Sequence, residues 1–171
     1  LDLRHTDRAL AERLVARVVA EIDRLEAIFS LQRATSALSL LNQHGRLPRP
    51  PLELVAVLEA ALLFSDLSGS AFDVTIQPLW RLFADAAAKG AVPDRGAIAG
   101  SLALVGWRGV ELNRASLGFR RAGMAATLNG IAQGYITDRV TDLLRDAGVD
   151  DVLVDLGELR AAGIPQHSRP W

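Results

Sequence analysis

Cysteine is absent from the 171 residues of this chain. Its absence excludes disulfides, thiolate metal sites and cysteine nucleophiles. A cysteine-free chain fits the cytoplasm and equally a cysteine-poor periplasmic protein, so the compartment stays open at this point. The catalytic patterns G-x-S-x-G, H-E-x-x-H, G-x-G-x-x-G and the P-loop are missing as well. A serine hydrolase and a zinc enzyme are therefore poor interpretations.

The sequence also has no excess of one charge, because 19 basic residues face 20 acidic ones and the net charge is -1. Nucleic-acid-binding domains usually carry a basic stripe, and none is present, so we predict no nucleic-acid partner. The three histidines lie far apart without partners at ligand spacing, and we interpret them as surface residues: His5, His44 and His167. No apolar run reaches the roughly 18–20 residues of a membrane span, and no signal-peptide pattern opens the chain.

Half of the residues are hydrophobic, and this length suits one domain with a sizeable core, which we predict over residues 1–171. Apolar residues recur every three or four positions from Leu10 to Phe29 and predict a long amphipathic helix capped by Thr6. A strand end is predicted before it, over residues 1–5. Further helices are predicted over residues 36–42, 52–67, 76–89, 95–104 and 130–146.

Alternating side chains over residues 107–121 predict a β-hairpin, and residues 151–163 predict a buried strand, a turn and a second strand. Gly148 is expected to end the last helix as a C′ glycine. Because helices come first and strands follow, the order predicts an α+β fold, with helices packed on a mostly antiparallel sheet, rather than regular βαβ alternation.

The stretch TLNGIAQGYITD, residues 127–138, places two glycines where we expect a buried strand to pass into a helix. Asn129 is a candidate helix cap, and the glycines leave the first turn without side chains. Unpaired N–H groups and a partial positive charge make a helix start suitable for a phosphate, and the Gly130 carbonyl could reach a metal ion. The alternative is that the glycines only allow close packing against a strand.

Three other segments carry polar groups that could serve a site or only the fold. Asp73 follows Phe72 in SGSAFDVT, where its carboxylate could bind a ribose hydroxyl or a flavin N–H group, or cap a helix. The segment SALSLLN offers two hydroxyls and an amide that more often cap and terminate a short helix. Glu158, beside Gly157, lies at the end of a predicted strand, facing either a ligand or solvent.

In this order the segments resemble the ApbE family of flavin transferases. The family pattern is S-x-L-S-x-L-N, G-G-A-F-D-x-T-x-x-P-L, L-x-x-I-A-K-G-Y-x-x-D, a glycine-rich strand end and P-W. The corresponding segments here are SALSLLN, GSAFDVTIQPL, LNGIAQGYITD, VDLGELRAAG and RPW. The glutamine in GIAQGYITD further resembles the periplasmic NosX-like branch, associated with nitrous-oxide reductase maturation. The resemblance covers essentially the whole chain and implies the ApbE-like, T-fold-related α+β fold.

The resemblance implies an enzyme that uses FAD and Mg²⁺ and transfers FMN to a threonine or serine hydroxyl of an acceptor protein, releasing AMP. It also implies a location outside the cytoplasmic membrane. It places flavin or nucleotide contacts on six residues and a metal contact on the carbonyl of Gly130. The six residues are Gln32, Ala71, Phe72, Asp73, Thr127 and Gln133. The alternatives are a Mg²⁺-dependent FAD pyrophosphatase and a non-catalytic flavin-binding accessory protein for respiratory enzyme maturation.

The chain departs from the family pattern at several positions. Gln32 stands where many members carry an aromatic residue that stacks on the flavin, which makes hydrolysis conceivable in place of transfer. Thr127 replaces an aspartate, Gln133 replaces a lysine or acidic residue, and Leu156 replaces one glycine of the strand-end pair. The Met-Gly-Thr, His-x-x-x-Pro and Thr/Asp metal motifs are missing, and LDLRH and SRPW do not resemble natural termini. We therefore expect a fragment, truncated at both ends, that does not catalyse transfer alone.

Overall fold

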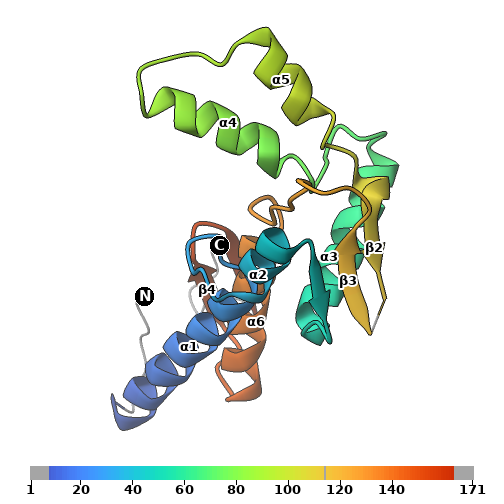
Figure 1. The fold of residues 1–171 in the computed structure, drawn as a ribbon. Coiled ribbons are helices and arrows are strands. Elements are labelled where there is room, and N and C mark those ends of the chain that lie inside the picture. The colour runs from blue at the N-terminus through green and yellow to red at the C-terminus, as the bar shows by residue number, and fades with distance from the viewer. Residues whose placement is uncertain (1–7, 114, 164–171) are drawn as a thin grey trace. The chain divides into compact units, whose positions relative to one another are not determined.

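The computed structural model describes residues 8–113 and 115–163. The chain divides into two compact units, each with its own set of elements (Figure 1). The central unit is Ala27–Gly130, and the terminal unit combines Leu1–Glu26 with Ile131–Trp171. The expected single domain over residues 1–171 stays a prediction. The strand end over residues 1–5 and the cap at Thr6 lie outside the described residues.

The terminal unit packs two helices against a β-hairpin. Helix α1 (Arg8–Phe29) contributes all but its last turn, and α6 (Ala132–Asp146) is followed by β4 (Val152–Asp155) and β5 (Leu159–Ala162). The two strands pair antiparallel, with Val152 opposite Ala162. The core of this unit is a cluster of six buried aliphatic residues: Leu14, Val18, Val140, Leu144, Val152 and Val154.

The local signals explain these elements. The apolar spacing of α1 buries Leu14 and Val18 on one face. Strand β4 alternates, so that Val152 and Val154 point into the core while Leu153 is 49% exposed. Helix α6 ends at the predicted glycine, because Gly148 has φ +83° and follows the last helical residues as a left-handed C′ residue.

The central unit contains the remaining helices and a three-stranded antiparallel sheet in the order β1-β3-β2. Its elements are α2 (Ala37–His44), β1 (Arg46–Pro48), α3 (Leu52–Leu67), α4 (Gln77–Ala87), α5 (Arg95–Leu102), the 3-10 turn η1 (Trp107–Gly109), β2 (Val110–Leu112) and β3 (Ser116–Phe119). The predicted hairpin is confirmed, since β2 and β3 pair directly. The fully buried side chains of the central unit include Leu38, Leu41, Leu54, Leu58, Val74, Leu117 and Leu128.

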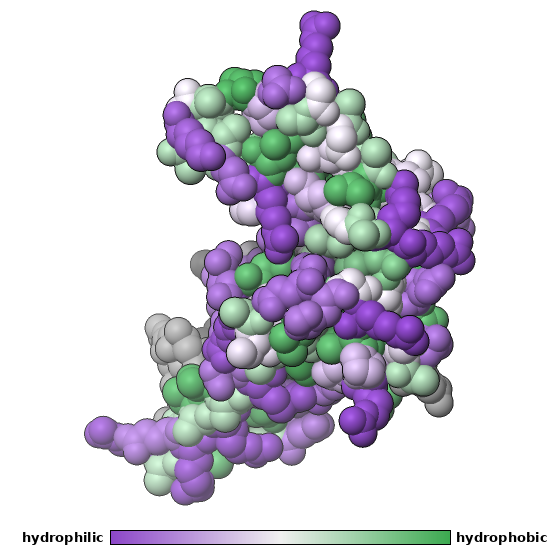
Figure 2. Space-filling view, viewed as in Figure 1, coloured by the Kyte–Doolittle hydropathy of each residue, from purple (hydrophilic) through white to green (hydrophobic). Residues whose placement is uncertain are grey.

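Helices α4 and α5 form a hairpin (Figure 1), and few of its side chains are buried. In α4 only Gln77 is buried, and α5 has no buried residue. Large apolar side chains stay exposed there, among them Trp80 (56%) and Leu102 (50%). Apolar residues of this hairpin are visible on the surface in Figure 2.

The α+β class with antiparallel sheets is confirmed, but the start of α6 differs from the prediction. The helix begins at Ala132 rather than Gly130, and its N-cap is Ile131, without a side-chain hydrogen bond. The prediction that Asn129 caps it is therefore wrong. Residues 124–128 are largely buried but belong to no strand, so the prediction of a strand before the helix is wrong too. Among the described residues no helix is both long and apolar enough to span a membrane.

Candidate functional site

The central unit contains a pocket of about 720 Å³. Two segments of the predicted site motifs line it, one at Ser70–Asp73 and one at Thr127–Gly130, although they are far apart in the sequence. The rest of the lining comes from the start of α4 and from the end of α5 with the loop after it: Val74, Ile76, Trp80, Leu102, Val105 and Gly106. A volume of this size is typical of a small-molecule site.

The carboxylate of Asp73 holds two walls of this pocket together. Its Oδ1 accepts hydrogen bonds from the N–H and the hydroxyl of Thr75, at 2.8 and 2.6 Å, and its Oδ2 accepts from the Trp107 N–H at 3.1 Å. The buried Thr75 hydroxyl accepts in turn from the Gly106 N–H at 2.7 Å. Asp73 therefore positions the loop before η1. It does not cap α4, which begins four residues later with Ile76 as its N-cap.

A second wall is held by a side chain from α2. The Asn42 amide forms a two-point contact with the main chain of Ala126, accepting from its N–H at 2.7 Å and donating to its carbonyl at 2.8 Å. The next residue, Thr127, donates its N–H to the Val74 carbonyl at 2.8 Å. These bonds replace a strand ladder for the buried segment before Gly130. Asn42 is thus a positioning residue and lies outside the pocket lining.

The two serines at the start of α2 serve the helix itself, which was the structural alternative for the segment SALSLLN. The Ser36 hydroxyl caps the helix by accepting from the Ser39 N–H at 3.0 Å, and the Ser39 hydroxyl donates to the Ser30 carbonyl at 3.1 Å. Both serines are buried. Neither hydroxyl lines the pocket, so in the central unit they serve the fold.

Gly130 packs against the ring of Phe72. A Cβ at this position would lie 3.0 Å from the Phe72 Cε2 atom, closer than side chains normally approach. The missing side chain therefore gives the aromatic ring room within the pocket wall. Gly134, in contrast, has no atom of the described residues within 4 Å of a Cβ position. The two glycines of the motif thus have different roles.

Five of the seven predicted site residues line this pocket: Ala71, Phe72, Asp73, Thr127 and Gly130. Gln32 is exposed on the loop after α1, where its N–H donates to the Ser30 hydroxyl, and it is not part of the lining. The sequence interpretation missed Trp80 and Leu102, because helical periodicity does not tell which exposed apolar residues flank a pocket. It also missed Thr75. The roles of the seven residues toward a ligand stay predictions.

Gln133 belongs to the terminal unit and contacts the hairpin there. Its Nε2 donates to the Leu156 carbonyl at 2.6 Å. Gly157 has φ +91°, and a Cβ at this position would overlap with the Gln133 amide. Only glycine fits both the backbone conformation and the space. The predicted glycine-rich strand end is therefore used to seat a side chain of α6.

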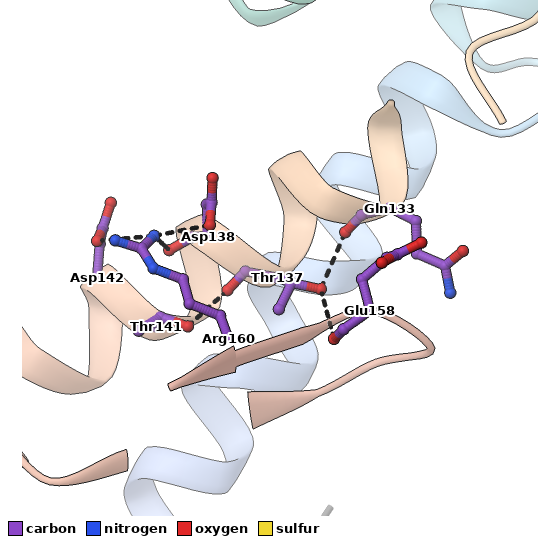
Figure 3. A network of polar contacts seen from close by, with 7 residues as sticks. All are labelled: Gln133, Thr137, Asp138, Thr141, Asp142, Glu158 and Arg160. Carbon is purple, nitrogen blue, oxygen red and sulfur yellow. Dashed lines mark hydrogen bonds and ion pairs between the residues drawn. The ribbon is translucent and has the colours of Figure 1, made fainter. Parts of the chain in front are cut away.

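A polar network ties α6 to β5 in the same unit (Figure 3). The Thr137 hydroxyl donates to the Gln133 carbonyl at 2.9 Å and reaches the Glu158 carbonyl at 3.5 Å, while the Glu158 side chain is exposed at the strand end. Arg160 reaches Asp138 at 2.9 Å and Asp142 at 3.4 Å. Glu158 thus contributes its backbone here, and its carboxylate role stays a prediction.

One carboxylate of the terminal unit, Glu21, has a lowered pKa, and it does not line the pocket. The Glu21 carboxylate accepts two hydrogen bonds from Arg24, at 2.8 and 2.9 Å, and these bonds lower the pKa of Glu21 below its ordinary value. Arg139 adds to the effect from 4.0 Å.

Among the residues that the structure describes, no group of three or more His, Cys, Asp or Glu could hold a metal ion. His44 is exposed, as predicted; His5 and His167 lie outside the described residues.

The sequence matches the ApbE family over residues 2–171. A FAD:protein FMN transferase of Klebsiella pneumoniae (strain 342) is 36% identical over 153 residues, which are 85% of this chain and 48% of that protein. One of Treponema pallidum (strain Nichols) is 33% identical over 88% of this chain and 46% of its own length. The chain therefore spans about half the length of the curated relatives it matches.

Solved structures show the same fold. The apo form of Pseudomonas stutzeri flavinyl transferase ApbE superposes with a TM-score of 0.82 at 28% identity, over 94% of this chain and 53% of that one. Flavin transferase ApbE from Vibrio cholerae superposes with a TM-score of 0.86 at 24% identity, over 100% of this chain and 56% of that one. The predicted fold is confirmed over this shared half.

Proposed function

This chain belongs to the ApbE family, and from this premise we propose that the complete protein transfers FMN from FAD to a threonine or serine hydroxyl of an acceptor protein. The observation that carries the proposal is the meeting of Ser70–Asp73 and Thr127–Gly130 in one pocket. Both segments belong to the motifs that resemble the flavin transferases. Relatives that bear the name FAD:protein FMN transferase support the same activity.

The reaction converts the phosphoanhydride bond of FAD into a phosphate ester with the acceptor hydroxyl. The acceptor hydroxyl oxygen attacks the phosphorus of the FMN half, and a new P–O bond forms. The bond from that phosphorus to the bridging oxygen of the pyrophosphate breaks. AMP leaves with the bridging oxygen, and the hydroxyl proton is released. Because the enzyme itself forms no covalent bond in such a displacement, its role is to position the reacting groups and to stabilise the developing charge.

In this proposal the pocket walls position the dinucleotide. Asp73 and Thr75 fix the loop at Gly106 and Trp107, and Asn42 fixes the segment that carries Thr127 and Gly130. Gly130 is exposed and has no side chain of its own, so in this proposal a phosphate approaches its main chain beside the Phe72 ring. The predicted contacts of Ala71, Phe72 and Asp73 fall on the same pocket.

We propose Mg²⁺ as the metal on the resemblance alone, with the Gly130 carbonyl as one ligand. When bound, Mg²⁺ would supply neutralisation of the charge that develops on the phosphate groups. Magnesium sites of this kind use one or two carboxylates together with phosphate oxygens. Within residues 8–113 and 115–163 no metal-binding cluster of acidic residues exists, so these residues do not fit a complete site.

A mass measurement on the complete protein tests the proposal. The protein is incubated with FAD, Mg²⁺ and a peptide carrying Asp-x-x-Ser/Thr-x-Ala-Ser/Thr, the acceptor pattern that the resemblance implies. An FMN adduct on the peptide is the expected result. Free FMN and AMP without an adduct would indicate the pyrophosphatase, and bound but intact FAD would indicate the accessory flavin carrier. An Asp-x-x-Val-x-Ala-Val peptide is the control, because it offers no hydroxyl.

We also propose that the protein acts outside the cytoplasmic membrane and belongs to the NosX-like branch. The glutamine at position 133, where the family pattern has lysine, motivates the branch assignment. Cell fractionation of the source organism tests the location, and recovery of the protein with the cytoplasmic fraction would contradict it. FMN transfer to a nitrous-oxide reductase maturation protein, and to no other acceptor, would support the branch.

A further inference from the structure

We propose that Trp80 on α4, with Leu102 on α5, forms an apolar lip that holds a planar aromatic ring of the ligand. This inference rests on the proposed function, because it assumes a dinucleotide in the pocket. Both side chains line the pocket, yet they are 56% and 50% exposed. A large apolar surface beside a pocket is typical of a surface that a ligand covers.

The polar groups of the lining lie on the two motif segments, which also contribute the apolar Ala71 and Phe72, whereas the side chains from α4 and the end of α5 are apolar. Asp73, Thr127, Asn129 and the bare main chain of Gly130 provide polar groups. The contributions of α4, α5 and the start of the following loop are apolar: Ile76, Trp80, Leu102 and Val105. A dinucleotide also separates polar from apolar groups, because its phosphates and sugars are polar and its ring systems have apolar faces. The phosphates therefore match the polar groups and a ring matches the lip.

Trp80 also supplies the aromatic residue that is missing at position 32 of the sequence. Gln32, where many members of the family carry a stacking aromatic residue, is not part of the pocket lining among the described residues. Trp80 is an aromatic residue that does line the pocket, and an indole offers the largest apolar face for stacking of any side chain. Phe72 also lines the pocket, but its ring is half-buried against Gly130. The exposed aromatic face in this chain therefore lies on α4 rather than on the loop after α1.

Helix α4 also supplies a matched control. Phe83 lies three residues after Trp80 on the same helix and is 45% exposed, but it is not part of the pocket lining. Phe83→Ala therefore removes an exposed aromatic side chain of α4 without changing the pocket lining. Only the removal of Trp80 takes away a pocket wall.

The test compares dissociation constants of the complete protein and its variants for FAD, FMN and AMP, measured by calorimetry. Stacking of a base on an aromatic side chain contributes enough that Trp80→Ala should weaken FAD binding about tenfold or more. Trp80→Phe should stay within about threefold of the parent, because a smaller aromatic face remains. Phe83→Ala should match the parent. Circular dichroism shows whether each variant keeps the fold.

The two mononucleotides distinguish which ring contacts the lip. If Trp80→Ala weakens FMN binding and leaves AMP binding intact, the flavin ring lies there, and the reverse result places the adenine there. Quenching of tryptophan emission by the same ligand should decrease in Trp80→Phe, which reads out the contact without the alanine variant.

Three results would overturn the inference. If Trp80→Ala binds FAD as tightly as Phe83→Ala does, the lip holds no ring, while the proposed function stands. If Trp80→Ala slows FMN transfer to the peptide but leaves FAD affinity unchanged, the lip binds the acceptor instead. If the parent protein binds no FAD, the proposed function fails and the inference fails with it.

Discussion

The two units of this chain bury their apolar residues in different ways. The terminal unit encloses six aliphatic side chains between α1, α6 and the β4–β5 hairpin, and the Arg160 network adds polar contacts at its surface. The central unit also has buried leucines, but it leaves a pocket of about 720 Å³ open and keeps Trp80 and Leu102 exposed. The terminal unit thus closes its apolar cluster, whereas the central unit leaves apolar side chains exposed beside a pocket.

Hydrogen bonds to the main chain show the same contrast. In the terminal unit the hydroxyls of Thr137 and Thr141 donate to the carbonyls of their own helix four residues earlier. In the central unit, Asn42 and Asp73 bind main-chain groups 84 and 34 residues away, and both bonds support the pocket walls. The terminal unit also has long-range contacts, such as the Gln133 amide to the Leu156 carbonyl 23 residues away, but there they join α6 to the β4–β5 hairpin.

The largest effect is expected from the closed core of the terminal unit. Leu144→Ala removes a side chain that is 4% exposed within the six-residue cluster. The lost burial and the cavity together should lower the free energy of unfolding by about 2–5 kcal/mol, measured by urea titration. Leu153→Ala, at a position that is 49% exposed, is the control and should stay within about 0.5 kcal/mol. Equal effects of the two variants would contradict the description of this core.

Asn42→Ala should give the next largest effect and should reach the pocket. It leaves the N–H and the carbonyl of Ala126, a fully buried residue, without their partners. We expect a loss of about 2–3 kcal/mol in unfolding free energy, together with weaker FAD binding because the neighbouring Thr127 wall moves. The control is Gln43→Ala, since the exposed Gln43 amide only donates to the Ala34 carbonyl. An Asn42→Ala variant with parental stability would show that the two hydrogen bonds between Asn42 and Ala126 do not stabilise the fold.

Asp73→Asn should lower FAD affinity more than stability. The variant keeps the shape of the side chain but turns one oxygen into an N–H donor, which then faces a donor at either Thr75 or Trp107. We expect a destabilisation of about 1–2 kcal/mol and roughly tenfold weaker FAD binding, measured by calorimetry. Asp94→Asn is the control, because Asp94 caps α5 and asparagine caps a helix equally well. Unchanged FAD affinity in a folded Asp73→Asn protein would refute both the ligand contact and the wall role.

The smallest effect concerns pH and the terminal unit. Because Arg24 lowers the pKa of Glu21 in the folded state, the unfolded chain binds the proton more tightly. The stabilisation is therefore complete above the unfolded pKa of about 4.5, and it is lost as the pH falls through the folded value. Glu21→Gln should flatten this part of the stability profile, measured by urea titration between neutral and acidic pH. Arg24→Gln should flatten it too, and an unchanged slope in both variants would contradict the assignment.

Much of the fold could be predicted from the sequence, because its signals are local. The apolar spacing of α1, the serine at the start of α2 and the glycine after α6 each act within a few residues. The bounds of α3 agree with the predicted residues 52–67. The predicted start of α6 was wrong because the helix begins at Ala132 without a side-chain cap, although Asn129 is a residue type that often caps helices.

By itself the sequence determined the order of the helices and of the two β-hairpins and the motifs that identify the family, since periodicity and turn chemistry depend on neighbours along the chain. It did not predict strand β1 (Arg46–Pro48). Only the tertiary structure decided that Asp73 braces a loop instead of capping a helix, that Asn42 clamps Ala126, and that Trp80 rather than Gln32 borders the pocket. Those roles depend on contacts between residues that are tens of positions apart, and burial and hydrogen-bond geometry fix such contacts only after the chain has folded.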